Sequence, residues 1–144
     1  MIQEDTIKLL RECNAGIKMG VGSIDEVLPK VKGSQLRNSL EKSRSAHTKL
    51  GDETHSLLAQ YGYRGKEPSP VAKGMSWMKT NVQLALEDSD KTVANLITDG
   101  CNMGVKSLNR YLNQYKAAEE QAKRIADRLI TLEDSLAQEM QPYL

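Results

Sequence analysis

Apolar residues recur every three or four positions along most of the chain. This spacing gathers them on one face of an amphipathic α-helix. In a half-buried strand, apolar residues would instead recur at every second position. No segment shows a strand-like alternation of useful length. The pattern therefore predicts an all-α fold with four long helices and one shorter helix, in a single domain that covers residues 1–144.

The first predicted helix has a stripe that continues nearly to a proline and a glycine, Pro29 and Gly33, which mark its end. Its members are Ile7, Leu10, Cys13, Asn14, Ile17, Val21, Ile24, Leu28 and Val31. A competing interpretation stops this helix at Gly22 and begins another, with Ser23 and Glu26 as a capping box. We favour one helix with at most a kink at Gly22.

The second predicted helix begins near Ser34, a suitable N-cap residue, and ends at Gly62. Its stripe consists of Leu36, Leu40, Ser43, His47, Leu50, Thr54, Leu57 and Tyr61. The stretch GYRGKEPSP follows, and its glycines, prolines and charges predict a long loop.

Three further stripes follow the loop. A shorter helix is predicted from Val71, Met75, Met78, Val82 and Leu86, with Trp77 beside them. Asp88 or Ser89 can cap the next helix, whose stripe is Val93, Ile97, Cys101, Gly104, Leu108, Leu112 and Tyr115. The last stripe is Ala118, Ala122, Ile125, Leu129, Leu132, Leu136, Met140 and Tyr143.

A short pattern occurs twice, because CNAGIK at 13–18 matches CNMGVK at 101–106 in residue type at five of six positions. Together with similar helix ends, LAQYGY and LAQEMQPY, this suggests a duplicated helical hairpin with a pseudo-twofold axis. Gly16, Gly20, Gly100 and Gly104 each cost about 1 kcal/mol relative to alanine in a helix. We expect the equivalent helix of the other half to press against these glycines, the alternative being tolerated glycines that face solvent.

Charge and composition narrow the classes of partner. The chain has twenty basic and nineteen acidic residues, for a net charge of +1, so neither nucleic acid nor an anionic membrane is an expected partner. The segment MIQEDTIKLL lacks the features of a signal peptide, and no apolar run approaches the length of a membrane span. Two cysteines without a secretion signal indicate reduced thiols and a cytoplasmic location.

A resemblance rests on the segment VAKGMSWMKTNVQLALEDSDKTVANLITDGCNMGVKSLNRYL, in which Gly74, Trp77 and Met78 are the most specific positions. With the preceding helical pair and loop, it resembles a bacterial family of ferritin-like four-helix bundles of unknown function. The likeness covers about Thr6 to Tyr143. It implies a ferritin-like up-down bundle with an additional short helix in the crossover, and a stress-related role, but no reaction.

The ligand pattern of a ferritin-like di-iron site is incomplete in this sequence. Such a site needs a Glu from each of two helices and Glu-x-x-His from each of the other two. The chain has two His residues, both on the second helix, and the nearest match is Asp52 with His55. Helical spacing turns Glu12 and Asp99 away from their stripes. We therefore expect no cofactor, with iron or zinc as the alternative.

Two residues fall on apolar stripes or beside them although they are polar. His47 lies in the stripe of the second helix, and Glu133 lies beside that of the last helix. Buried Glu is rare unless it is paired, so a His47–Glu133 hydrogen bond at the bundle centre is one hypothesis. The favoured interpretation is a satisfied core His and a Glu that reaches solvent along the helix edge. His47, Glu133, His55 and Asp52 are the candidate metal ligands.

The two cysteines and the shorter helix give the remaining candidates. Cys13 and Cys101 occupy equivalent predicted positions, where they are either a redox pair or, as we favour, two small buried apolar residues. Met75, Trp77 and Met78 form a candidate contact surface, and a homodimer is the partner that it suggests. The alternative, which is more usual for such residues, is that they cover the end of the bundle.

The sequence thus predicts a non-catalytic ferritin-like bundle, self-associating or partner-binding, in a bacterial cytoplasm. The alternative is a ferritin-like metal-binding or oxidative-stress protein with a degenerate site.

Overall fold

The computed structural model describes residues 2–63 and 89–144, and over these ranges it is helical without a strand. The long helices are α1 (Ile2–Val27), α2 (Ser34–Gln60), α4 (Asp90–Gln114) and α5 (Glu120–Met140). Short 3₁₀ segments, η1 (Leu28–Lys30) and η2 (Gln141–Tyr143), follow α1 and α5. The prediction of an all-α fold with four long helices is confirmed. The predicted shorter helix over 71–86 lies outside the described residues, as do Met75, Trp77 and Met78.

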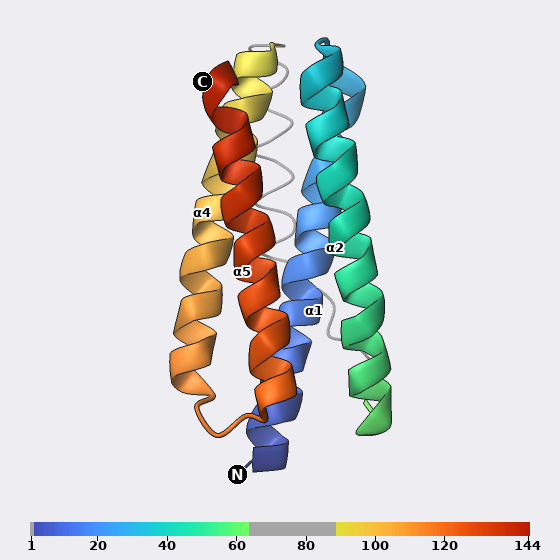
Figure 1. Cartoon of the computed structure of the whole chain (residues 1–144), viewed down its shortest axis with the longest axis vertical. Coiled ribbons are helices and arrows are strands. Elements are labelled where there is room, and N and C mark those ends of the chain that lie inside the picture. Colours follow the sequence, from blue (N-terminus) through green and yellow to red (C-terminus); the bar gives the residue numbers. More distant parts are fainter. Residues whose placement is uncertain (1, 64–88) are drawn as a thin grey trace.

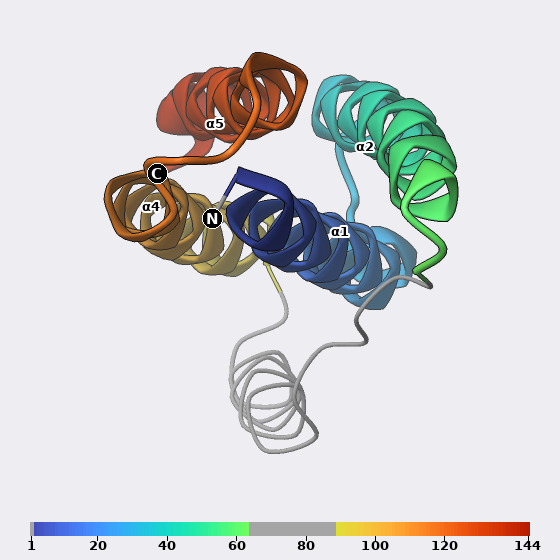
Figure 2. The ribbon, with the colours of Figure 1, turned by 90° about the horizontal axis from the view of Figure 1, so that it is seen from below.

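The four helices form a bundle in which neighbouring helices are antiparallel. In Figure 1, α1 and α5 rise while α2 and α4 descend, and Figure 2 shows the order α4, α1, α2, α5 around the bundle. The first hairpin is therefore up-down and the second down-up. Since α2 and α4 run in the same direction, the chain passes from one end of the bundle to the other between Tyr63 and Ser89.

Helix α1 is continuous through Gly22, so the interpretation that ends a helix there is wrong. Ile24 and Val27, beyond Gly22, are each 1% exposed, and the burial of their side chains stabilises the helix past Gly22. The helix ends before Pro29, as predicted. It also buries Leu9 and Ala15, which lie outside the predicted stripe, because it packs against α2, α4 and α5 together.

The beginnings of α2 and α4 are tied together by a carboxylate. Asp90 accepts hydrogen bonds from the backbone N–H groups of Lys32 (2.8 Å) and Gly33 (2.9 Å). The predicted N-cap at Ser34 is wrong, because Gly33 occupies that position and Ser34 is already helical. The predicted cap at Ser89 is confirmed, since its hydroxyl accepts from the Thr92 N–H at 3.2 Å.

The opposite end of the bundle is fixed in the same manner, by α1. Asp5 accepts a hydrogen bond from the Ala117 N–H at 3.1 Å, and the Thr6 hydroxyl accepts from the Glu119 N–H at 2.8 Å. Glu119 is the N-cap residue of α5, and its own side chain makes no capping bond. Backbone donors just before and at the start of α5 are therefore satisfied by side chains more than a hundred residues away.

The interior divides into two apolar clusters along the bundle axis. One cluster includes Leu10, Cys13, Leu58 and Leu129, and the other includes Leu36, Leu40, Cys101 and Met140. No helix within residues 2–63 and 89–144 is both long enough and apolar enough to cross a membrane.

We predict that Asp90→Ala lowers the free energy of unfolding by about 1–3 kcal/mol, because two backbone donors lose a charged acceptor. Urea denaturation followed by circular dichroism measures the change. Asp52→Ala is the control, since Asp52 is exposed on α2, and it should change stability by less than about 0.5 kcal/mol. Equal effects of the two substitutions would contradict the tie between α2 and α4.

Candidate functional site

A histidine and a glutamate meet in the middle of the bundle. His47 Nε2 on α2 lies 3.1 Å from Glu133 Oε1 on α5, and the two residues are 0% and 8% exposed. The hypothesis of a buried His47–Glu133 pair is confirmed. The favoured interpretation, in which Glu133 reaches solvent, is wrong, because the side chain turns inward to the only imidazole among the buried polar residues.

The second ring nitrogen of His47 determines how many protons the His47–Glu133 pair must hold. His47 Nδ1 lies 2.8 Å from the Ser43 carbonyl oxygen, which can only accept a hydrogen bond, so Nδ1 carries a proton. The Ser43 hydroxyl lies near the same nitrogen, at 3.3 Å. Between Nε2 and Oε1 one further proton is then required, held either as an imidazolium–carboxylate pair or as a neutral imidazole facing a carboxylic acid.

The environment favours the charged form of the imidazole. Burial by itself would lower the pKa of His47, but the hydrogen bond and negative charge of Glu133, with the Ser43 carbonyl, act more strongly in the other direction. The net result is a pKa above the ordinary value of 6.5. The Glu133 side chain therefore stabilises the protonated form of the His47 ring.

Two glycines, one from each hairpin, make room for this pair. A Cβ atom at Gly20 on α1 would lie 3.1 Å from His47 Cδ2 and 3.5 Å from Glu133 Oε1. A Cβ atom at Gly104 on α4 would lie 3.5 Å from Glu133 Cδ. The helices α1 and α4 thus flank the pair closely, with backbone rather than side chains at the nearest points.

The prediction that the glycines contact the equivalent helix of the other half is wrong. The atoms nearest to Gly16, Gly20 and Gly104 belong to side chains of α2 and α5, and nothing lies within 4 Å of a Cβ at Gly100. The reason is that α1 and α4 pack side by side while Gly16, Gly20 and Gly104 turn toward the bundle centre and Gly100 faces outward. The duplication itself stays a prediction.

Both thiols are buried and protonated. Burial, with the charges of Glu12 and Asp127, raises the pKa of Cys13 to about 12. Burial also raises the pKa of Cys101, as do the charge of Glu133 and the hydrogen bond that its carboxylate accepts. The cysteines are free and lie in different apolar clusters, as two buried apolar residues rather than a redox pair. Cys101 thus borders the His47–Glu133 pair.

The other candidate ligands do not join this centre. Asp52 and His55 are exposed on α2, and Asp99 is exposed on α4. Glu12 is half-buried, and its carboxylate accepts a hydrogen bond from Tyr111. Among the residues that the structure describes, no three His, Cys, Asp or Glu side chains are grouped so that they could hold a metal ion.

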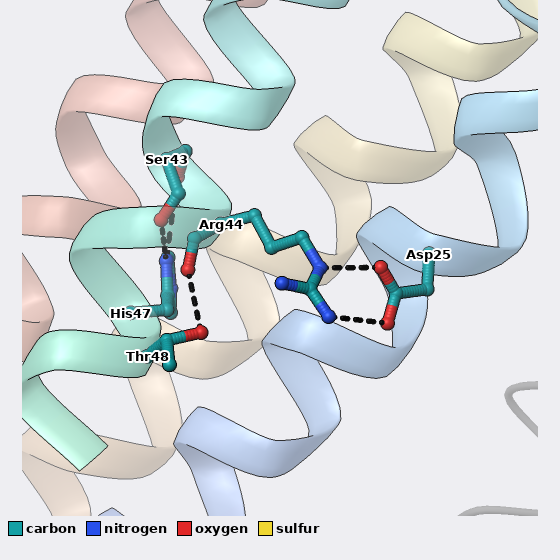
Figure 3. A network of polar contacts seen from close by, with 5 residues as sticks. All are labelled: Asp25, Ser43, Arg44, His47 and Thr48. Atoms are coloured by element: carbon teal, nitrogen blue, oxygen red, sulfur yellow. Dashed lines mark hydrogen bonds and ion pairs between the residues drawn. The ribbon is translucent and has the colours of Figure 1, made fainter. Parts of the chain in front are cut away.

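Figure 3 shows adjacent turns of α2, where Ser43 contacts His47 and Thr48 bonds to the Arg44 carbonyl within the helix, while the Arg44 side chain reaches α1. Arg44 points away from His47 and binds both carboxylate oxygens of Asp25 on α1. The Asp25–Arg44 pair is about half exposed, unlike the His47–Glu133 pair. Helix α2 is therefore joined to α1 by a surface ion pair and to α5 by a buried one.

The contacts that line the boundary between α2 and α5 could not be predicted from the helical periodicity. Arg128 binds both carboxylate oxygens of Glu53, at 3.0 and 2.6 Å, and Tyr61 donates a hydrogen bond to Glu119 at 2.7 Å. Two shallow grooves lie along the same boundary, one of them between Ala46 and Leu132. These partners are about 60–75 residues apart in the chain, so periodicity within one helix could not reveal them.

No family model, curated protein or solved structure matches this chain. The resemblance to a ferritin-like family therefore stays a prediction from the sequence pattern.

Gly20 and Gly100 allow a matched test of the space around the pair. We predict that Gly100→Ala raises the free energy of unfolding by up to about 1 kcal/mol, because helix propensity improves and the Cβ meets open space. Gly20→Ala should instead lower it by about 1–3 kcal/mol, because the Cβ displaces the His47 ring. Chemical denaturation of both variants measures the difference, and a stabilised Gly20→Ala protein would show that the ring has room to move.

Proposed function

We propose that this protein is a non-catalytic helical bundle of ferritin-like type that works by associating with a second copy of itself or with another protein. The observation that carries the proposal is the closed centre of the bundle. Both nitrogens of His47 are bonded within the protein, and the pKa of each thiol is raised by burial. Groups held in this way stabilise a fold, whereas catalytic groups need access to substrate.

The direction of the helices supports the ferritin-like part of the proposal. A single long crossover between two antiparallel hairpins is the connectivity of ferritin-like bundles. The parallel directions of α2 and α4 require such a crossover here. The free, buried cysteines are consistent with the proposed cytoplasmic location, where thiols are kept reduced.

The outer faces of the helices supply apolar side chains for association. Met103 on α4 is 66% exposed and Ile2 on α1 is 60% exposed, and Tyr63 and Leu144 are also exposed. Large apolar side chains on a surface are a common element of protein–protein contacts. With the interior closed, these outer faces are where a partner would bind.

We expect sedimentation-velocity ultracentrifugation to show a weight-average mass that rises with protein concentration. Self-association through apolar surface predicts that Met103→Lys shifts this rise to higher concentration, whereas Lys106→Met, one turn further along α4, does not weaken it. A single monomeric species at every concentration would contradict self-association and leave a different protein as the proposed partner.

The alternative, a metal-binding protein with a degenerate ferritin-like site, has less support from the geometry. His47 Nε2 is already bonded to Glu133, while Asp52 and His55 lie on the surface. We predict that protein expressed in iron-supplemented medium contains neither iron nor manganese in stoichiometric amounts, measured by elemental mass spectrometry. Two iron atoms per chain, lost in Glu133→Gln, would favour the alternative.

A further inference from the structure

Helices α2 and α5 meet along a boundary that we call the α2–α5 seam. Helix α2 packs most extensively on α1, and α5 packs most extensively on α4, so the seam joins the two hairpins. Two shallow grooves lie along it. Figure 2 shows α2 and α5 at one side of the bundle, with α1 and α4 at the other.

Helix α2 also has an unusually polar buried face. Of its seven buried residues, three are polar, namely Ser43, His47 and Thr54. The Thr54 hydroxyl is satisfied within the helix by the Leu50 carbonyl, at 2.8 Å, and gives α2 no tie to its neighbours. Release of α2 from the bundle would therefore expose less apolar surface than a fully apolar stripe would.

Among the described residues, three polar contacts cross the seam, and one of them is buried. Glu53–Arg128 is about half exposed, and Tyr61–Glu119 is also at the surface. Exposed ion pairs contribute little to stability because water and salt screen them. His47–Glu133 is enclosed by the bundle, so it is the polar contact on which closure of the seam depends.

One proton keeps this contact favourable. The Ser43 carbonyl holds a proton on Nδ1, so Nε2 and Oε1, 3.1 Å apart, need one proton between them. When that proton leaves to solvent, the lone pair of Nε2 faces a negatively charged oxygen. The carboxylate is then buried without a partner for that oxygen, and moving α2 away from α5 lets water solvate it.

We propose that the α2–α5 seam is a pH-sensitive latch, closed while one proton bridges His47 and Glu133 and open when that proton is lost.

The groups that face His47 from the other helices do not change charge in place of the bridging proton. From α5 the charge facing the ring is that of Glu133; from α4 the neighbouring titratable group of the pair is the Cys101 thiol, and from α1 the nearest residue is the uncharged Gly20. Asp134 acts on Cys101 rather than on the ring. Burial raises the pKa of Cys101 above its usual range, so the thiol stays neutral while His47 titrates.

The direction of the pH effect follows from linkage. Because the pKa of His47 is raised in the folded protein, the closed state binds more protons than an open or unfolded state. The contribution of the pair is complete below the unfolded value of about 6.5 and is lost as the pH rises through the folded value. Between these two pKa values the equilibrium constant for opening rises by up to about tenfold per pH unit, and above the folded value it levels off.

Hydrogen–deuterium exchange with mass spectrometry tests the latch, with rates corrected for the intrinsic effect of pH. Between about pH 6 and about pH 9, we expect protection of peptides from the middle of α2 to fall at least tenfold, while peptides from the middle of α1 and α4 keep theirs. Equal loss of protection in all four helices would show that the pair stabilises the whole fold and is not a latch. Unchanged protection in α2 would also overturn the proposal.

Glu133→Gln gives the sharper comparison. The Gln amide can donate to neutral His47 and hold the seam closed without a bridging proton. Burial without a negative charge should then lower the pKa of His47, so the pH dependence should reverse, with protection of α2 lost as the pH falls. Glu53→Gln, which alters the exposed contact of the same seam, should behave as the unaltered protein. A Glu133→Gln protein with an unchanged pH dependence would overturn the proposal.

His47→Gln provides a second variant in case Glu133→Gln does not fold. Its amide can donate to the Glu133 carboxylate at every pH, so protection of α2 should be independent of pH over the same range. A persistent loss of protection at high pH in this variant would assign the effect to another group and overturn the latch.

Discussion

A buried contact between an imidazole and a carboxyl group is the constraint around which this bundle is arranged. Bringing an imidazolium and a carboxylate out of water costs several kcal/mol for each ion, and that cost is recovered only through close, fully bonded contact. His47 reaches that condition through Ser43 on its own helix and Glu133 on α5. The backbone of α1 at Gly20 and of α4 at Gly104 completes the enclosure. All four long helices therefore meet at one polar contact, which fixes the register of α2 and α5 along the bundle axis.

The apolar stripes made most of the architecture predictable. Four helices follow from the spacing of residues such as Leu36 and Leu40 on α2, because a period near 3.6 residues has a single structural meaning when it is sustained. The same reasoning placed His47 on a buried face, and the rarity of unpaired buried Glu suggested its partner. The preference between the two interpretations of Glu133 was wrong. A side chain that reaches solvent was favoured, but in this bundle it turns inward to the imidazole.

The errors concern contacts between distant segments. Ser34 has the right chemistry for an N-cap, but Asp90 binds the loop before α2 from the start of another helix, and local sequence cannot show such a partner. Glycine within a helix indicates that something approaches closely, without showing what. At Gly20 the neighbour is a histidine ring rather than a second backbone, and at Gly100 there is no neighbour at all. The α2–α5 seam was unpredictable for the same reason, since it joins hairpins through residues far apart in the chain.

The contact of Gly20 with the His47 ring has a consequence for how this sequence can change. Positions 20, 47, 104 and 133 share one small volume, so a larger residue at any of them must be matched by a smaller or uncharged one elsewhere in the set. Replacing either residue alone by one that cannot hydrogen-bond strands the other, at a cost of about 3–5 kcal/mol, whereas joint replacement by apolar residues can be neutral. In relatives or redesigned variants these four positions should therefore be exchanged as a group, and a lineage that fills position 20 should have lost the charge pair as well.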